Sequence, residues 1–201
     1  GPRPRSRRRR NFMTYASYGP NALLTPANIV SFARILFTAP LLWLIVDRDG
    51  PSIPAVLLWT VLTWSDGVDG YLARRHGRTT SGAFLDPLAD KILVLGAMFT
   101  LVAVGGLWWL PVTLIAVREV AISIYRSVVS RKGITVPAVW LAKVKVVTQG
   151  LAVGFALLPY TVENVPQLAG WTLWIATGLT LYTGYDYLRG AGAQAVPAGP
   201  H

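Results

Sequence analysis

Six apolar stretches, each about 20 residues long, dominate this chain and constrain its fold more than any other feature. A stretch of about this length crosses the hydrocarbon core of a bilayer as a single helix. Turn-forming residues such as Asp49-Gly50-Pro51 and Gly105-Gly106 separate the stretches. The sequence therefore predicts an all-α integral membrane protein with six transmembrane helices, at residues 27–46, 53–72, 83–105, 108–129, 138–160 and 167–188.

The composition agrees with a membrane protein and argues against an ordinary soluble domain. Of the 201 residues, 53% are hydrophobic and only 14% are charged, whereas a soluble domain has about 25% charged residues. The absence of cysteine excludes a disulfide framework and a thiolate metal site. The net charge of +10 does not indicate nucleic-acid binding, because six of the nineteen basic residues lie in the first ten positions, beside the apolar body.

The positions of the basic residues predict the orientation in the cell membrane. With a cytoplasmic N-terminus, the inside segments hold twelve Arg and Lys residues and the outside loops hold Arg48 alone. This excess predicts that both termini are cytoplasmic. We expect a basic segment at 1–24, either a juxtamembrane helix or disordered, a six-helix domain at 25–190 and a disordered tail at 191–201. No cleavable signal peptide is expected, because residues 11–25 are too polar for a signal core.

Four aspartates lie within 25 residues, where the second apolar stretch ends and the third begins. Asp66 and Asp69 are three residues apart and Asp86 and Asp90 are four apart, so each pair shares a helix face. Charges close to hydrocarbon usually face a polar cavity with a function, and we expect this cavity to open to the cytoplasm. Four ionised carboxylates require cations, and their oxygen atoms suit Mg²⁺ or Mn²⁺. Two such ions would match the arrangement used in phosphoryl transfer.

Small residues and one arginine accompany these carboxylates. Arg74 follows Asp66 by about two helical turns and can bridge a phosphate. Small side chains let a ligand approach the backbone closely, and four of them occur here: Gly67, Gly70, Ala73 and Gly82. Helix packing alone would explain such glycines but not four aspartates beside them. The pattern suggests a diphosphate ligand with an attached base or sugar.

The order Asp66-x-x-Asp69-Gly70-x-x-Ala73-Arg74, followed by Gly82-x-x-x-Asp86-x-x-x-Asp90, resembles the signature of the CDP-alcohol phosphotransferases. The resemblance covers about residues 25–190 and implies a six-helix fold. It departs from the family in one spacing, because seven residues separate Arg74 from Gly82 where eight or more are usual. We therefore expect a shortened loop between the second and third helices.

The resemblance also implies roles for these residues. Asp66, Asp69 and Asp86 would hold two metal ions, and Asp90 would complete the metal site and act as the general base. The CDP pocket would be lined by Asp66, Gly67, Asp69, Gly70, Ala73, Arg74 and Gly82.

Basic residues in or near the apolar stretches point to an anionic second substrate. Glu119 is the one acidic residue beside them. The basic residues are five: Arg34, Arg118, Arg126, Lys143 and Lys145. An excess of buried cations calls for an anion, and the phosphate of glycerol 3-phosphate would supply one. Arg118 and Lys143 are the stronger candidates. For Arg126 and Lys145 an equal alternative is that they neutralise the aspartates or reach the membrane interface.

Within the family, several segments resemble the phosphatidylglycerophosphate synthases. These are Asp86-Pro87-Leu88-Ala89-Asp90-Lys91, Arg118-Glu119, Lys143-x-Lys145-x-x-x-Gln149, and Asn28-x-x-Ser31-x-x-Arg34, in which Ser31 replaces a threonine. The resemblance implies transfer of a phosphatidyl group from CDP-diacylglycerol to glycerol 3-phosphate, with release of CMP, by a homodimer embedded in membrane lipids. No nucleic-acid partner is expected.

Three alternatives remain open at the level of the sequence. The same chemistry with another acceptor would make a cardiolipin synthase, which uses phosphatidylglycerol, or a phosphatidylinositol phosphate synthase, and serine is a further possible acceptor. A divalent-cation transporter would also have intramembrane carboxylates, although transporters commonly consist of pseudo-symmetric halves and all four aspartates here lie in one half. A membrane scaffold would not require the carboxylates.

Overall fold

The computed structural model describes residues 26–76, 80–131, 140–159 and 164–194, and within these ranges it contains helices and no strands. All six predicted helices are present. Their bounds are α1 Pro26–Asp47, α2 Ile53–His76, α3 Thr80–Ala103, α4 Trp109–Arg131, α5 Trp140–Leu157 and α6 Val165–Gln194. Only three residues separate α2 from α3, in agreement with the expected short loop.

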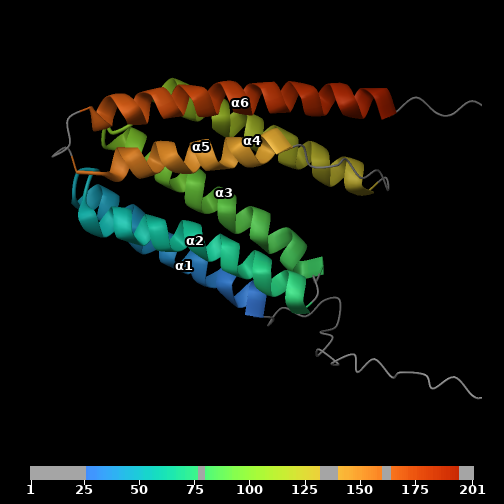
Figure 1. The fold of residues 1–201 in the computed structure, drawn as a ribbon, viewed down its shortest axis with the longest axis horizontal. Helices are drawn as coiled ribbons and strands as arrows, with labels where there is room; N and C mark the ends of the chain where they lie inside the picture. Colours follow the sequence, from blue (N-terminus) through green and yellow to red (C-terminus); the bar gives the residue numbers. More distant parts are fainter. Residues whose placement is uncertain (1–25, 77–79, 132–139, 160–163, 195–201) are drawn as a thin grey trace, which may run out of the picture.

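Successive helices run in opposite directions, as Figure 1 shows. The α1–α2, α3–α4 and α5–α6 connections lie at one end of the bundle, which we call the loop end. The start of α1, the end of α6 and the junction of α2 with α3 lie at the other end, which we call the motif end. Helix α1 packs against α2 and α3, α6 packs against α4 and α5, and α5 also contacts α2 and α3.

Turn chemistry ends α1 and α3 where the sequence predicts it. After α1, the Gly50 amide donates to the Ile45 carbonyl at 2.7 Å, with Asp49 at φ 52° and Gly50 at φ 106°. After α3, the Gly106 amide makes the corresponding 2.7 Å bond to the carbonyl five residues earlier, and Gly105 has φ 75°. This is the pattern of a Schellman cap, which needs a left-handed residue and is most easily made by glycine.

The interior of the bundle changes from apolar to polar along its length. Toward the loop end the core consists of aliphatic side chains and Trp59, which is 4% exposed. Toward the motif end the buried positions of α1, α5 and α6 carry polar groups: Asn28, Ser31, Arg34, Thr38, Lys145, Gln149, Thr180 and Thr183. Because buried polar groups require partners, this half of the bundle is where a functional site is to be sought.

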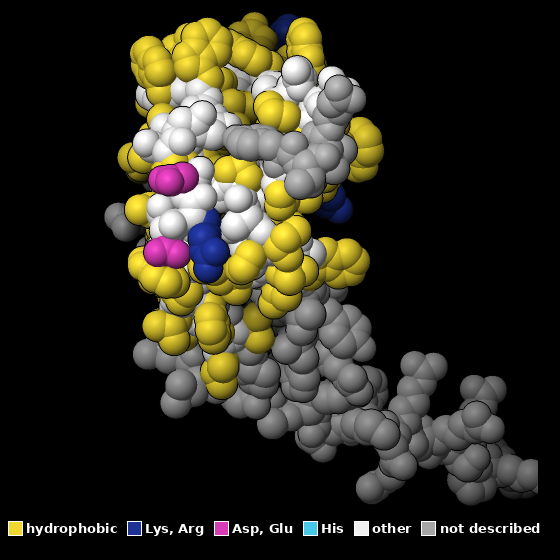
Figure 2. All heavy atoms as spheres, turned by 90° about the vertical axis from the view of Figure 1, so that its left-hand side faces the viewer, with side chains coloured by type: hydrophobic (Ala, Val, Ile, Leu, Met, Phe, Trp, Pro, Cys, Tyr) yellow, Lys and Arg dark blue, Asp and Glu magenta, His cyan; other side chains and the backbone are white. Residues whose placement is uncertain are grey.

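Large apolar side chains are exposed on every helix. Figure 2 shows this for the loop end, where few charged side chains interrupt the apolar surface. Among the described residues, only α1 is both long enough and apolar enough to qualify by itself as a membrane span, over Asn28–Asp47 with mean hydropathy 2.1. Helix α2 adds a shorter apolar segment, Ile53–Ser65.

The ends of the chain differ in part from expectation. The predicted basic segment at 1–24 lies outside the described residues. Helix α6 continues to Gln194, so the first four residues of the predicted tail are helical, whereas 195–201 lie outside the described residues.

Candidate functional site

The four signature aspartates lie on two helices whose ends meet at the motif end. Asp66 and Asp69 belong to the last turns of α2, and Asp86 and Asp90 belong to the first turns of α3. The side chains of residues 66–84 are outside the part that the structure describes. The metal and CDP-binding roles predicted for this stretch therefore stay predictions, and they concern Asp66, Gly67, Asp69, Gly70, Ala73, Arg74 and Gly82.

Helix α1 contacts both signature segments from one face. The Ser31 hydroxyl donates a hydrogen bond to Oδ1 of Asp86 on α3 at 2.5 Å. One turn later, Nε of Arg34 donates to the hydroxyl of Ser65 on α2 at 3.4 Å. Ser65 directly precedes Asp66, and Arg34 is only 1% exposed. Helix α1 therefore orients one predicted metal ligand and places a buried cation beside the segment that carries two others.

The available donors suit a hard divalent cation. Asp86 and Asp90 are both partly buried and lie one turn apart on α3. Among the described side chains no group of three His, Asp or Glu residues is close enough to hold a metal, and Asp66 and Asp69 lie outside that search. A set of carboxylate oxygens without histidine or thiolate fits Mg²⁺ or Mn²⁺.

A second polar cluster joins α4, α5 and α6. Glu119 accepts hydrogen bonds from Lys145 and from Nη1 of Arg118, the latter at 3.1 Å. Nη2 of Arg118 donates to the Thr183 hydroxyl at 2.9 Å. The ionic side chains are 8–13% exposed. We call these four residues the Arg118 cluster.

The Arg118 cluster retains positive charge and an available donor. Its two cations face one carboxylate, and Lys91 of α3 lies within electrostatic range of Glu119 and Lys145. Nε of Arg118 is buried and has no hydrogen-bond partner among the described residues. Buried donors are nearly always paired, so the unpaired Nε marks Arg118 as a cation whose hydrogen-bonding capacity is not fully used by the described residues. Lys91 belongs to α3, the helix that also carries Asp86 and Asp90.

The other predicted acceptor residues lie apart from this cluster. Lys143 is exposed whereas Lys145 is buried, since residues two apart on a helix point to nearly opposite sides. Lys145, for which the sequence left two roles open, is thus the member that the structure brings to Glu119. Arg126 is exposed on α4, and Arg34 lies beside α2.

Sequence reasoning missed three residues of the site. Ser31 occurs in a motif that the sequence displays, but its contact with Asp86 is apparent only from the packing of α1 on α3. Thr183 and Gly184 are 65 and 66 positions from Arg118, and no local pattern marks them. Their contacts with Arg118 arise from the packing of α6 on α4.

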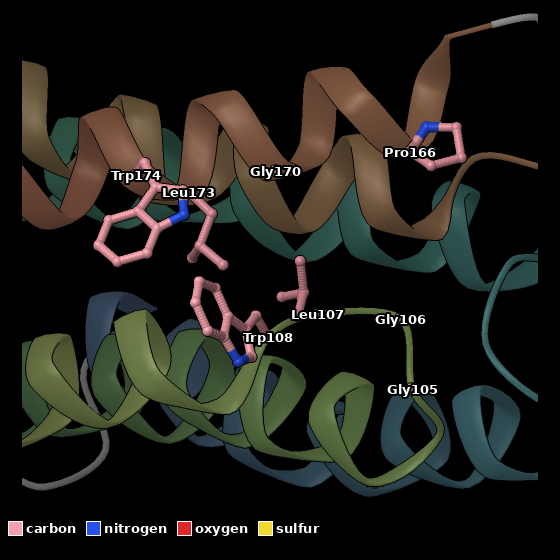
Figure 3. A pocket seen from close by; sticks show the side chains of 8 residues that line it. All are labelled: Gly105, Gly106, Leu107, Trp108, Pro166, Gly170, Leu173 and Trp174. Atoms are coloured by element: carbon pink, nitrogen blue, oxygen red, sulfur yellow. The ribbon is translucent and has the colours of Figure 1, made fainter.

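A cavity of about 400 Å³ lies away from this site, at the loop end. The α3–α4 connection lines one side of it, and the first turns of α6 line the other (Figure 3). Trp108 and Trp174 meet edge to face there, with ring centroids 5.6 Å apart. The described residues that line it are glycine, leucine, proline and tryptophan, so this cavity offers none of the carboxylates or cations that the predicted chemistry needs.

Comparison with known proteins assigns the family. The profile described as CDP-alcohol phosphatidyltransferase matches residues 24–182. The chain belongs to this family. This confirms the resemblance that the aspartate signature carries. Enzymes of the family associate with membranes and use a divalent metal ion.

Similar proteins agree on one reaction. A probable phosphatidylglycerophosphate synthase of Mycobacterium tuberculosis (strain ATCC 25618 / H37Rv) is 34% identical over 174 residues, which cover 82% of this chain and 80% of the relative. A CDP-diacylglycerol–glycerol-3-phosphate 3-phosphatidyltransferase of Bacillus subtilis (strain 168) is 34% identical over 84% of this chain and 92% of its own. The Escherichia coli (strain K12) protein of the same name is 33% identical over 83% and 90%.

Family membership decides between the classes of function. The chain is an enzyme of the CDP-alcohol phosphatidyltransferase class. The alternatives of a divalent-cation transporter and of a membrane scaffold are therefore set aside.

Proposed function

We propose that this enzyme transfers the phosphatidyl group of CDP-diacylglycerol to glycerol 3-phosphate, forming phosphatidylglycerol phosphate and CMP in phospholipid biosynthesis. The names of the three relatives support this reaction. The observation in the chain itself that carries the choice of acceptor is the Arg118 cluster, with its positive charge and its buried Nε donor. A phosphorylated acceptor satisfies such a site, whereas a neutral alcohol leaves it unpaired.

The reaction requires removal of a proton from the acceptor hydroxyl. As this oxygen attacks the phosphorus of the phosphatidyl group, the bond from that phosphorus to the CMP oxygen breaks, and CMP leaves with the electron pair. Asp90 accepts the hydroxyl proton. Arg74 and the small residues of α2 and α3 bind the CDP moiety.

Two Mg²⁺ or Mn²⁺ ions are the proposed cofactors, held by Asp66, Asp69, Asp86 and Asp90. When bound, they neutralise charge that develops on the diphosphate. The Ser31 hydroxyl supports this role, because it orients the Asp86 carboxylate from α1. We expect EDTA to abolish turnover and added Mg²⁺ or Mn²⁺ to restore it, and full activity in EDTA would contradict the proposed metal site.

The acceptor phosphate is proposed to bind Arg118, and Lys143 stays a predicted second contact although it is exposed and does not join the Arg118 cluster. Arg34, Arg126 and Lys145 are proposed to add positive potential. Arg118 has the strongest structural support, because its guanidinium is oriented by Glu119 and Thr183 and its Nε has no hydrogen-bond partner among the described residues. Glu119 forms ion pairs with both Lys145 and Arg118, so its single negative charge does not neutralise both cations.

The proposed setting is the cell membrane, which all six helices cross, with both termini and the active site on the cytoplasmic side. The exposed apolar side chains support it, since on α1 they extend from Ile29 to Val46, about 25 Å at 1.5 Å per residue. Seven of the eight tryptophans are more than 40% exposed, as expected for contact with lipid and its interfaces. A homodimer is proposed from family likeness alone.

A panel of acceptors tests the proposed function. Purified enzyme is supplied with CDP-diacylglycerol, a divalent metal and one of glycerol 3-phosphate, phosphatidylglycerol, inositol phosphate or serine, and CMP release is measured. We expect rapid release with glycerol 3-phosphate only. Release with phosphatidylglycerol, inositol phosphate or serine instead would reassign the acceptor, and release with none of the four would contradict the proposal.

A further inference from the structure

Gly184 of α6 lies against Arg118 more closely than any other residue type would allow. A Cβ atom at position 184 would be 2.8 Å from Nε of Arg118 and 3.2 Å from its Cγ. Carbon atoms pack favourably at 3.5–4.0 Å, so the arginine would have to move. The neighbouring residue, Thr183, accepts the hydrogen bond from Nη2 of the same arginine.

Two hydrogen bonds restrain the arginine. Its guanidinium is held on one side by Glu119 and on the other by Thr183, at 3.1 and 2.9 Å. Glu119 is itself tied to Lys145 on α5. The Thr183 hydroxyl donates to the carbonyl of Leu179 at 2.7 Å, so its position on α6 is set by its own helix. A shift of Arg118 would therefore break at least one of these charge-assisted contacts.

We propose that Thr183 and Gly184 are positioning residues for the acceptor site, which act by orienting the guanidinium of Arg118. Thr183 holds Nη2 of the guanidinium, and Gly184 provides the clearance for Nε and the adjoining stem of the side chain. Together they fix the orientation in which the guanidinium would meet the phosphate of the acceptor. The inference rests on the proposed function, in which Arg118 binds that phosphate, and it assigns to α6 a share in acceptor recognition.

Paired variants test this role. Gly184→Ala is compared with Gly178→Ala on the same helix, because a Cβ at position 178 meets nothing within 4 Å. Thr183→Val, which keeps the shape but loses the hydroxyl, is compared with Thr183→Ser, which retains it. KM for glycerol 3-phosphate, KM for CDP-diacylglycerol and kcat are measured for each, together with the melting temperature in detergent.

We expect Gly184→Ala and Thr183→Val to raise KM for glycerol 3-phosphate roughly tenfold or more, as for loss of a hydrogen bond to a charged group. KM for CDP-diacylglycerol should change little, and Gly178→Ala and Thr183→Ser should stay close to the wild type. Equal KM values for Gly184→Ala and Gly178→Ala would overturn the inference. A parallel rise of both KM values would also overturn it, because a general packing defect affects both substrates.

Repeating the paired variants in an Arg118→Ala background separates the positioning role of α6 from the proposed acceptor site at Arg118. If α6 acts through the arginine, Gly184→Ala and Thr183→Val add no further change in KM once Arg118 is removed. Persistence of their effects in this background would overturn the positioning role while leaving the proposed function intact. An unchanged acceptor KM in Arg118→Ala itself would instead contradict the acceptor site of the proposed function, and the inference would fall with it.

Discussion

At the scale of single residues, the hydrogen bond from Ser31 to Asp86 joins a polar motif on α1 to a predicted metal ligand on α3. The motif Asn28-x-x-Ser31-x-x-Arg34 places its three polar residues one turn apart on α1, and all three are buried. The structure shows that this stripe faces α2 and α3. A hydroxyl that holds one oxygen of a carboxylate leaves the other oxygen free to bind a metal.

Loss of this hydroxyl should lower activity without unfolding the protein. We expect Ser31→Ala to reduce CMP release by about tenfold, the effect of removing one hydrogen bond to a charged group, and to raise the Mg²⁺ concentration needed for half-maximal activity. Ser31→Thr keeps a hydroxyl and should retain most activity. The measurement is a metal titration of CMP release, and equal titration curves for Ser31→Ala and wild type would show that the bond has no role in the site.

The proposed base Asp90 can be tested separately from its role as a ligand. Asp90→Asn removes the proton acceptor but keeps an oxygen atom of similar size. We expect near-complete loss of turnover with affinity for CDP-diacylglycerol largely retained, measured by equilibrium binding in detergent. Should the variant lose binding of metal and nucleotide to the same degree as turnover, Asp90 serves only as a ligand.

At the scale of helices, the Arg118 cluster joins α4, α5 and α6, the half of the bundle that does not carry the four signature aspartates. Helices α4, α5 and α6 each contribute at least one member, and Lys91 brings α3 within electrostatic range. Removing one partner of a buried ion pair leaves an uncompensated charge, which is more destabilising than removing an exposed pair. The cluster should therefore affect folding as well as acceptor binding.

Stability measurements can show this difference. Glu119→Gln leaves Arg118 and Lys145 without their carboxylate, and we expect it to lower the free energy of unfolding by about 3–5 kcal/mol. Asp47→Asn is the matched control, because it breaks the exposed ion pair with Arg48 and should cost about 0–1 kcal/mol. Thermal unfolding in detergent measures both, and equal melting temperatures would argue against a buried, mutually dependent cluster.

The helices were predictable from the sequence, but their side-to-side contacts were not. The lengths of the apolar stretches and the positions of turn residues located all six helices. Both features are local in the sequence, because a membrane-spanning helix needs about 20 apolar residues and a helix end favours glycine. The sequence favoured Lys143 over Lys145, and the opposite burial of the two depends on which face of α5 packs against α6, α2 and α3. The contact between Arg118 and Thr183 joins positions 65 apart, and no local pattern encodes such a pairing.

At the scale of the whole molecule, the antiparallel order of six helices places the start of α1 and the end of α6 at the motif end (Figure 1). The face of the loop end shows few charged side chains (Figure 2). The basic residues predicted to be cytoplasmic belong to the ends of the chain and to the α2–α3 and α4–α5 connections. In the orientation proposed above, the aspartates lie on the side of the membrane where water-soluble CMP and glycerol 3-phosphate are available.

Topology reporters test this orientation. A reporter fused after His201 should be cytoplasmic, and one inserted between Gly105 and Gly106 should be on the opposite side of the membrane. Compartment-specific enzymatic or fluorescent reporters give the answer in intact cells. A reporter after His201 that proves external would mean that the chain crosses the membrane an odd number of times or in the reverse orientation.

The central claim is phosphatidyl transfer to glycerol 3-phosphate, and the fate of the glycerol carbon atoms tests it most directly. Purified enzyme is incubated with CDP-diacylglycerol, a divalent metal and ¹³C-labelled glycerol 3-phosphate, and the lipid product and CMP are quantified by mass spectrometry. The account predicts labelled phosphatidylglycerol phosphate in one-to-one ratio with CMP, and neither product from Asp90→Asn. CMP release without label in the lipid would contradict it.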